Sequence, residues 1–389
     1  MHKIELGLTL LSLIIWLFLL TWRGQFWRTD QLLEVSLPLP PSPPLPSVCA
    51  VIPARNEADL LPITLRSLLT QDYPGSFTVF LVDDHSTDGT TQVAIATAVE
   101  LGKEKQLQVI AAETLPPGWT GKLWAMEQGI QKAQTLAPDY LLLTDADIQH
   151  DVTNLRRLVN KAQQENLDLV SVMVRLRCES FWEQLLIPAF VFFFQKLYPF
   201  RWVNNPRNST AAAAGGCILV SQDSLTKIGG IQVVRQALID DCALAEAVKK
   251  SGGNIWLGLS ALTCSLRPYP SLETIWGMVA RTAFTQLNYS PLLLLGTLFG
   301  MMIIYMLPPL ATVIGVGTGY WSLAVAGLAG WLLMTLAYFP TIRFYKCSPF
   351  FAFCLPAIGF LYTLMTFDSA LRHWQGRGGA WKGRVYPTG

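Results

Sequence analysis

The chain has 389 residues and is markedly apolar, with 51% hydrophobic residues, 14% charged residues and a mean hydropathy of +0.35. A soluble domain usually carries about 25% charged residues, so this composition excludes a wholly soluble protein, and it also excludes intrinsic disorder. A net charge of +2 excludes a nucleic-acid binder that must neutralise many phosphates. Seven scattered cysteines without a CxxC pair indicate neither a zinc site nor a disulfide framework, and they suit a reducing compartment. We therefore expect an integral membrane protein with a cytosolic domain.

The first apolar run, residues 4–22, is long enough to cross a bilayer, and no small-residue cleavage site follows it. It predicts an uncleaved transmembrane anchor over 1–24. Lys3 precedes the run, whereas Arg23 and Arg28 follow it. By the positive-inside rule this bias favours an external N-terminus and a cytoplasmic position for the next domain.

Residues 25–47 are expected to link this anchor to the globular domain. Six prolines occupy nine positions at 38–46, and such a stretch forms neither a helix nor a central strand. It predicts a stiff polyproline spacer, in preference to a ligand for a proline-reading partner.

Beyond the linker, short apolar runs alternate with polar helical stretches. The apolar runs predict strands at 48–54, 77–84, 107–112, 140–147 and 167–174. The stretches between them predict helices that include 57–70, 89–102 and 122–136. This alternation is typical of βαβ units, so we expect an α/β domain over 48–285 with a mostly parallel sheet and flanking helices. Ligands of such sheets bind beyond the carboxyl ends of the strands.

An aromatic segment interrupts this domain at 181–202, where nine of 22 residues are aromatic and Pro188 and Pro199 break the run. Its uncharged part is too short to span a bilayer. We interpret it as an interfacial segment with aromatic rings at the level of the lipid headgroups. The alternative is a buried core helix.

The C-terminal part is again strongly apolar. Its runs at 291–315, 321–341 and 349–367 predict about three transmembrane segments in a membrane region over 286–370, and a basic tail follows at 371–389. Four full spans in the chain would leave this tail outside, against the positive-inside rule. One C-terminal run is therefore expected to be re-entrant or broken, at Pro308-Pro309 or at Pro356.

Two polar motifs near predicted strand ends suit a nucleotide. Asp83 and Asp84 follow an apolar strand and precede Ser, Thr, Asp and Gly, which indicates a strand-to-helix turn. Their oxygens suit the donors of a base and a ribose, while Asp88 or Thr87 suits a helix cap. Glu57, after the first strand, suits the same donors or a cap.

Lys122 begins a predicted helix after a Pro-Pro-Gly turn. There it suits a diphosphate, with a solvated lysine as the alternative.

Asp145 and Asp147 form a second acidic motif, and their i, i+2 spacing points both side chains the same way in an extended segment. Converging carboxylates predict a site for Mg²⁺ or Mn²⁺, completed by substrate phosphates and water. His150 is either a further ligand or a neighbour.

Asp240 and Asp241 form the third acidic motif, at the start of a predicted helix over 241–250. An ordinary N-terminal cap is one interpretation, because negative charge suits the helix dipole. The other is a general base that takes a proton from an attacking hydroxyl.

Taken in order, VIPARNE, VDDHSTDGT, GKLWA, TDAD and IDD resemble the motifs of family 2 glycosyltransferases of the GT-A fold, over about 48–285. The anchor and the C-terminal spans make the chain similar to ceramide glucosyltransferases. GWTGKLWAMEQG, TDADIQH, STAAAAGGC and RTAFTQL resemble the bacterial hopene-associated glycosyltransferases more closely.

This resemblance implies roles for particular residues. It implies a nucleotide-sugar donor, with a UDP-sugar expected, and a divalent metal, Mg or Mn, on Asp145 and Asp147. The donor would be held by Pro53, Arg55, Glu57, Asp83, Asp84, Lys122, Asp145 and Gly216, with Gly215 beside it. Three residues would be catalytic: Asp241 as the general base, Asp240 beside it, and Arg281 as a cation for the leaving diphosphate. Arg281 alone remains of a longer Gln/Arg-x-x-Arg-Trp motif, which disfavours processive polymer synthesis.

We therefore expect a membrane-bound, inverting, non-processive glycosyltransferase of the bacterial plasma membrane with a cytoplasmic catalytic domain. Its expected acceptor is a lipid, and the resemblance implies a hopanoid or a similar polyisoprenoid. The alternatives are a polyprenyl-phosphate sugar transferase, a polysaccharide synthase and a non-catalytic membrane scaffold. A transporter is disfavoured because the apolar runs carry almost no ionisable residue.

Overall fold

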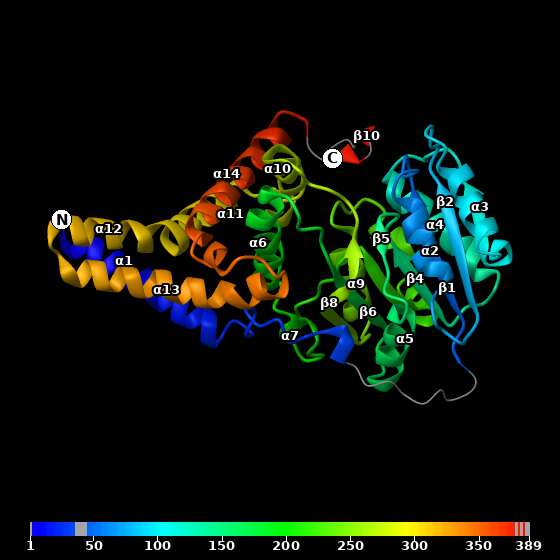
Figure 1. The fold of residues 1–389 in the computed structure, drawn as a ribbon, viewed down its shortest axis with the longest axis horizontal. Coiled ribbons are helices and arrows are strands. Elements are labelled where there is room, and N and C mark those ends of the chain that lie inside the picture. The colour runs from blue at the N-terminus through cyan, green and yellow to red at the C-terminus, as the bar shows by residue number, and fades with distance from the viewer. Residues whose placement is uncertain (1, 36–44, 378–379, 382–383, 386–389) are drawn as a thin grey trace.

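The computed structural model describes residues 2–35, 45–377, 380–381 and 384–385, and it is elongated, with a helical lobe at one end and an α/β domain at the other (Figure 1). Most of the proline-rich stretch predicted as a spacer, and part of the basic tail, lie outside the described residues. At the far end of the chain, β9 (Ala380–Trp381) pairs with β10 (Arg384–Val385).

The α/β domain is built on an eight-stranded sheet in the order β3-β2-β1-β4-β7-β6-β8-β5. Neighbouring strands are parallel except that β7 is antiparallel to β4 and β6, and β5 is antiparallel to β8. The mostly parallel sheet predicted from the sequence is confirmed. Its strands are β1 (Val48–Ala54), β2 (Phe77–Asp83), β3 (Leu107–Ala111), β4 (Tyr140–Thr144), β5 (Ile148–Gln149), β6 (Leu169–Arg175), β7 (Cys217–Ser221) and β8 (Ile255–Ser265).

Helices cover both faces of this sheet, because its strands are apolar on both sides. In β1, Cys49 and Val51 face the core that includes α4, whereas Ala50 and Ile52 face the core that includes α2, α3 and α5. The helices of this domain are α2 (Leu61–Leu69), α3 (Thr90–Glu100), α4 (Gly121–Gln134), α5 (Asn154–Gln164), α8 (Gln222–Lys227) and α9 (Asp240–Lys250).

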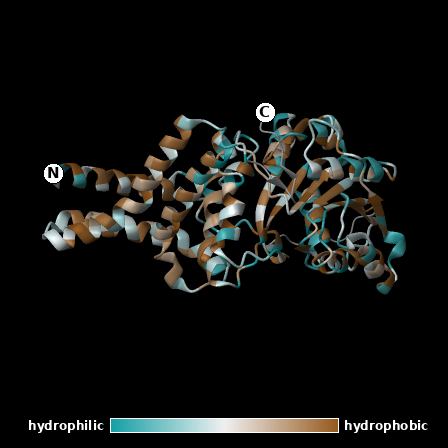
Figure 2. Ribbon diagram, turned by 90° about the horizontal axis from the view of Figure 1, so that it is seen from above, coloured by the Kyte–Doolittle hydropathy of each residue, from teal (hydrophilic) through white to brown (hydrophobic). Residues whose placement is uncertain are grey.

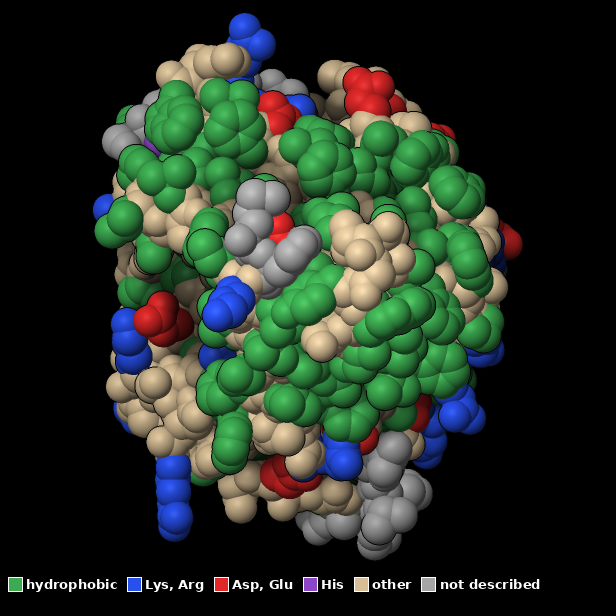
Figure 3. Space-filling view, turned by 90° about the vertical axis from the view of Figure 1, so that its left-hand side faces the viewer, with side chains coloured by type: hydrophobic (Ala, Val, Ile, Leu, Met, Phe, Trp, Pro, Cys, Tyr) green, Lys and Arg blue, Asp and Glu red, His purple; other side chains and the backbone are tan. Residues whose placement is uncertain are grey.

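The helical lobe holds three helices long and apolar enough to cross a membrane among the described residues: Lys3–Thr21, Pro291–Thr318 and Trp321–Phe344. They correspond to α1 (His2–Thr21), to α11 (Pro291–Met301) with α12 (Leu307–Thr318), and to α13 (Trp321–Phe344). Figure 2 shows that this lobe is mostly hydrophobic. In Figure 3 hydrophobic side chains gather over its end, with charged side chains toward the rim.

The third C-terminal run forms α14 (Leu355–Trp374), which is not among these three helices. Two of the three C-terminal runs therefore form candidate spans. Pro308-Pro309 stands at the start of α12, directly after a π-helical segment at Met302–Met306, because a proline nitrogen cannot donate the regular helical hydrogen bond. Pro356 stands in the first turn of α14, where a proline is tolerated.

The junction between lobe and domain is formed by α6 (Phe181–Leu197), α7 (Phe200–Val203) and α10 (Leu272–Ala280), as Figure 1 shows. The aromatic segment is thus helical and partly buried. Phe192 packs on Tyr338 of α13 with ring centroids 5.1 Å apart, whereas Phe181 remains 61% exposed.

The N-terminal connection is also tied to the domain. Leu259 of β8 donates a backbone hydrogen bond of 2.7 Å to the Gln31 carbonyl oxygen, and Leu32 forms a parallel bridge with Leu259. In the short helix that follows (Leu33–Val35), the Glu34 carboxylate accepts hydrogen bonds from Ser260 and Ala261. The segment that follows α1 is therefore attached to the domain by hydrogen bonds as well as by the chain itself.

Candidate active site

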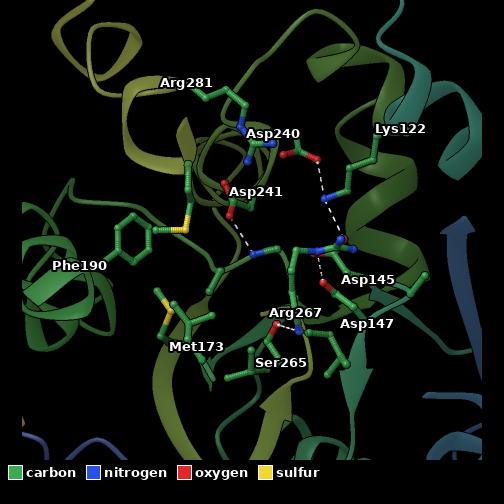
Figure 4. Close-up of a pocket in the computed structure, with 18 of the residues that line it drawn as sticks. Lys122, Asp145, Asp147, Met173, Phe190, Asp240, Asp241, Ser265, Arg267 and Arg281 are labelled. Carbon is green, nitrogen blue, oxygen red and sulfur yellow. Dashed lines mark hydrogen bonds and ion pairs between the residues drawn. The ribbon is translucent and has the colours of Figure 1, made fainter. Parts of the chain in front are cut away.

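A cavity of about 610 Å³ opens at the carboxyl ends of β1 and β4 and is closed by α6, α9 and α10 (Figure 4). Its polar part is lined by charged side chains: Glu57, Lys122, Asp145, Asp147, Asp240, Asp241, Arg267 and Arg281. Its apolar part is lined by Met173, Val174, Leu176, Phe190, Phe194 and Met278. A site of this kind offers charge recognition at one end and an apolar surface at the other.

The end of β1 contributes Pro53 and Glu57 to the cavity wall. Arg55 and Asp84 do not line it. They lie together beside it, because an Arg55 guanidinium nitrogen donates to the Asp84 carbonyl oxygen at 2.6 Å and lies 3.7 Å from its carboxylate. Of the residues that were predicted to hold the nucleotide, Pro53 and Glu57 therefore line the cavity, whereas Arg55 and Asp84 do not.

Asp83 also lies outside the cavity lining, and its carboxylate stabilises the turn after β2. One oxygen accepts a hydrogen bond from the Ser86 backbone N–H at 3.0 Å, and the other accepts one from the Thr91 hydroxyl at 2.7 Å. Asp88 accepts a hydrogen bond from the Thr90 backbone N–H, but the N-cap residue of α3 is Gly89, so neither Asp88 nor Thr87 is the cap predicted from the sequence.

The aspartate pair after β4 reaches the cavity with both carboxylates. Asp145 lies 3.0 Å from the Lys122 ammonium, and Asp147 accepts a hydrogen bond of 2.6 Å from Arg267 Nε. Burial and the charge of Asp145 raise the pKa of Asp147. Each carboxylate of the pair therefore has its own side-chain cation.

His150 is a neighbour of this pair and does not line the cavity. Its Nε2 lies 3.0 Å from the Thr144 hydroxyl and its Nδ1 lies 3.0 Å from Asn154 Nδ2, so both ring nitrogens have partners. Burial lowers its pKa to about 3, which keeps the imidazole neutral. A structural role explains these contacts.

Lys122 stands in the first turn of α4, which begins after Thr120, whose hydroxyl caps the helix. Its ammonium lies between Asp145 and Asp240, at 3.0 and 3.5 Å. Burial alone would lower its pKa, but these two carboxylates outweigh that effect and raise it. Lys122 is therefore a permanent cation at the polar end of the cavity.

Asp241 is the carboxylate at the centre of the cavity (Figure 4). Its two oxygens accept hydrogen bonds of 2.8 Å from the backbone N–H groups of Gly215 and Cys242. Burial and the neighbouring charge of Asp240 raise its pKa to about 6, although Lys122 and the two N–H donors oppose this. A carboxylate in this range accepts a proton near neutral pH more readily than an ordinary aspartate.

The turn that precedes β7 passes close to this carboxylate because it carries two glycines, Gly215 and Gly216. A Cβ at Gly215 would lie 3.3 Å from Asp241 Oδ2, and one at Gly216 would lie 3.3 Å from Ile148 and Val174. Arg281, at the end of α10, points toward Asp240 and Asp241 (Figure 4).

Arg267 is the charged residue of the cavity to which sequence reasoning gave no role. It is the second residue after β8 and bridges Asp147 and Glu57, with Nη2 2.7 Å from Glu57 Oε1. The sequence did contain a signal for Arg267, because a charged residue near the end of a long apolar strand is the same pattern that identified the acidic motifs. The contribution of α10 to the apolar wall was also missed, because helix faces meet there through tertiary packing.

The site suits a hard divalent cation. Asp145 and Asp147 offer carboxylate oxygens at one wall, and among the described residues no group of three or more His, Cys, Asp or Glu forms a closed metal site. Two protein carboxylates with the remaining positions left to phosphates and water is the arrangement that Mg²⁺ and Mn²⁺ commonly use.

The mostly parallel sheet with its flanking helices has the GT-A fold, and the acidic cavity lies at the carboxyl ends of its central strands. The structure is similar to that of the mannosyltransferase PcManGT from Pyrobaculum calidifontis, solved with GDP-Man and Mn²⁺, with a TM-score of 0.53. The similarity covers 97% of this chain and 96% of that one at 18% sequence identity, so it concerns the fold, helical lobe included.

Residues 49–229 match the family described as Glycosyl transferase family 2. Asp240, Asp241, Arg267 and Arg281 lie beyond the matched residues. The beta-monoglucosyldiacylglycerol synthases of Nostoc sp. and Trichormus variabilis are each 30% identical to this chain over 141 residues. Those residues are 36% of this chain and 28% of the length of each relative.

Proposed function

We propose that the protein is an inverting glycosyltransferase that moves one sugar from a nucleotide sugar, expected to be a UDP-sugar, to a hydroxyl of a membrane lipid. The observation that carries this proposal is the position of Asp241. This partly buried carboxylate with a raised pKa lies between the cation-lined end of the cavity and its apolar end.

The reaction is a single displacement with Asp241 as the base. Asp241 takes the proton of the acceptor hydroxyl while that oxygen attacks the anomeric carbon. The bond between this carbon and the diphosphate oxygen breaks, and its electron pair leaves with the nucleoside diphosphate. Backbone N–H donors from Gly215 and Cys242 orient the carboxylate, so it is held ready for the acceptor.

The cations of the cavity stabilise the leaving group. Lys122 lies beside Asp145, and Arg281 points into the cavity from the opposite side (Figure 4), so both can meet negative charge that develops on a diphosphate. Asp145 and Asp147 would hold a divalent metal, which supplies a further positive charge to the diphosphate when bound. Asp240 keeps Lys122 in place through their 3.5 Å contact.

The lipid acceptor reaches the base through the apolar end of the cavity. Phe190 and Phe194 of α6 and Met278 of α10 line it, and both helices belong to the junction with the helical lobe. A hopanoid or similar polyisoprenoid is the first candidate, on the resemblance of the motifs. A diacylglycerol is the second, because the two curated relatives are named as synthases of a glucosyldiacylglycerol.

The proposed location is the bacterial plasma membrane with the catalytic domain in the cytoplasm, where nucleotide sugars are made. The three apolar helices support membrane insertion. Polymer synthesis is disfavoured, because the motif around Arg281 is incomplete.

The test is transfer of radiolabelled sugar from UDP- and GDP-sugars to lipid by the purified full chain. Separate reactions receive a hopanoid fraction, diacylglycerol and a polyprenyl phosphate, each with Mn²⁺. Asp241→Asn should lower transfer to a hydroxyl acceptor by about 10²- to 10⁴-fold, the usual contribution of a general base. Asp223→Asn is the matched control, since Asp223 is exposed in the first turn of α8.

Each result separates the candidates. Labelled hopanoid or diacylglycerol that is lost in Asp241→Asn supports the proposal and names the acceptor. Equal labelling of polyprenyl phosphate by both proteins would instead indicate a phosphate nucleophile that needs little help from a base. If no donor is bound or transferred, a non-catalytic scaffold replaces the proposal.

A further inference from the structure

Arg267 joins two carboxylates of the cavity that the proposed reaction assigns to the donor and its metal. Its Nε donates to Asp147 at 2.6 Å and its Nη2 to Glu57 at 2.7 Å. Both carboxylate side chains are 9% exposed, whereas the arginine side chain is 32% exposed. Arg267 therefore lies on the cavity side of a nearly buried acidic pair.

The sheet holds this arrangement in register. Ile148 pairs with Ser265 where β5 meets β8, and the Leu266 backbone N–H donates to the Asp147 carbonyl oxygen at 2.8 Å. The turn that carries Asp147 and the segment that carries Arg267 are thus fastened at the backbone. A change of partner at this point therefore involves the Arg267 side chain and not the backbone.

A divalent cation bound by both Asp145 and Asp147 competes with this side chain. Asp145 is 35% exposed, so a cation can reach it beside Lys122. Asp147 is far less exposed, and Arg267 already contacts its Oδ2 at the distance of a strong charge-assisted hydrogen bond. When the Arg267 side chain leaves Asp147, the same side chain can still pair with Glu57.

We propose that Arg267 is a displaceable counterion that neutralises Asp147 until the metal binds and then turns to the diphosphate of the donor. The inference rests on the proposed function, because it assumes the metal pair. A diphosphate replaces the carboxylate that Arg267 loses, so metal and nucleotide should bind cooperatively. By linkage, each must strengthen the other by the same factor.

The test measures the binding of Mn²⁺ to the purified full chain with and without UDP. The electron paramagnetic resonance signal of free Mn²⁺ reports this binding. No sugar is present, so no turnover occurs. In the parent protein UDP should tighten Mn²⁺ binding by roughly tenfold or more, within the usual range of coupling between sites. Arg267→Gln should bind Mn²⁺ alone roughly tenfold more tightly and lose most of the effect of UDP.

Two variants serve as references. Arg156→Gln removes an arginine whose 2.9 Å pair with Asp72 lies on the surface, and it should leave both affinities unchanged. Arg267→Lys keeps the charge but has one ammonium in place of the two nitrogens that contact Asp147 and Glu57, so it should give intermediate coupling. The lysine variant also keeps the inference testable if Arg267→Gln fails to fold.

Unchanged or weaker binding of Mn²⁺ alone in Arg267→Gln overturns the inference, and so does parental coupling in Arg267→Lys. If Asp145→Asn and Asp147→Asn still abolish Mn²⁺ binding in that case, the proposed metal pair stands without the counterion. If the parent protein binds no Mn²⁺ with or without UDP, the metal pair fails and the inference fails with it.

Discussion

The protonation of Asp241 gives the proposed reaction a defined pH dependence. Burial and Asp240 raise its pKa to about 6. A base must be deprotonated, so kcat/KM should rise about tenfold per pH unit below pH 6 and level off above it. Lys122 lowers this pKa, so Lys122→Gln should move the acid limb of the profile to higher pH.

The exposed Lys132 lies on the same helix as Lys122, and Lys132→Gln should leave the profile unchanged. The measurement is the pH profile of transfer for the three proteins at saturating metal. An acid limb that stays in place in Lys122→Gln would contradict the assignment of that limb to Asp241.

Gly215 determines where the Asp241 carboxylate lies. In Gly215→Ala the new methyl group would lie 3.3 Å from Asp241 Oδ2 and 3.6 Å from Lys122 Nζ, which crowds the carboxylate and its backbone donor. Displacement of a catalytic group by about 1 Å can cost about 10²-fold in rate, so transfer should fall by that order. Gly296→Ala in α11, where the methyl group meets open space, should transfer normally. Equal activity of the two variants would refute this role.

The residues of the cavity were predictable in part. Asp145, Asp147, Asp240, Asp241 and Lys122 each follow a strand or begin a helix, and that local signal is visible in the sequence. The partners of these residues were not predictable. The pairing of Arg267 with Asp147 depends on β5 lying against β8, which no nearby residue encodes.

The packing of α4 on the sheet places Lys122 and allows a stability prediction. Gly129 faces β1 and β2, and a Cβ there would overlap Val51 Cγ1 and lie 2.9 Å from Val82 Cγ2. Gly129→Ala should therefore cost about 1–3 kcal/mol by overpacking, seen as a lower melting temperature of the purified protein. The control Gly277→Ala in α10 has open space around the new methyl group and should melt no lower than the parent. A stable Gly129→Ala protein would mean that α4 is not held closely against the sheet.

The predicted strands that became β1, β2, β3, β4 and β6 are confirmed, because each is a continuous apolar run bounded by polar residues. β7 and β8 were not predicted. Their direction and neighbours come from long-range pairing, as in the five residue pairs that join β7 to β4 antiparallel. Periodicity within a strand does not reveal this.

Charge is distributed unevenly about the helical lobe as a whole. Arg23 and Arg28 follow α1, and Arg343 and Lys346 lie at and just after the end of α13, at the ends that face the domain. α14 packs against α10 at the junction, where Asp368 accepts a hydrogen bond of 2.7 Å from Trp276 Nε1. With three crossings, the segment after α14 lies on the same side as the domain, which agrees with the positive-inside rule.

Labelling of introduced cysteines by a membrane-impermeant maleimide checks this arrangement. Thr318→Cys, at the end of α12, should react in intact cells. Arg377→Cys and Lys132→Cys should react in inverted vesicles instead, each compared with the parent protein as baseline. Reaction of Arg377→Cys in intact cells would show that α14 crosses the membrane.

The fastening of residues 31–34 to β8, together with α6 and α10, has a consequence for product length. In the proposed arrangement these attachments would hold Asp241 at a fixed height above the bilayer. A lipid that has received one sugar carries its outermost hydroxyls farther from the bilayer by the depth of a ring. To present them to the same base, the lipid would have to sink into the membrane or the domain would have to rise. We therefore expect each acceptor lipid to receive a single sugar, because the attachment of the domain to the helical lobe fixes the distance between the base and the membrane.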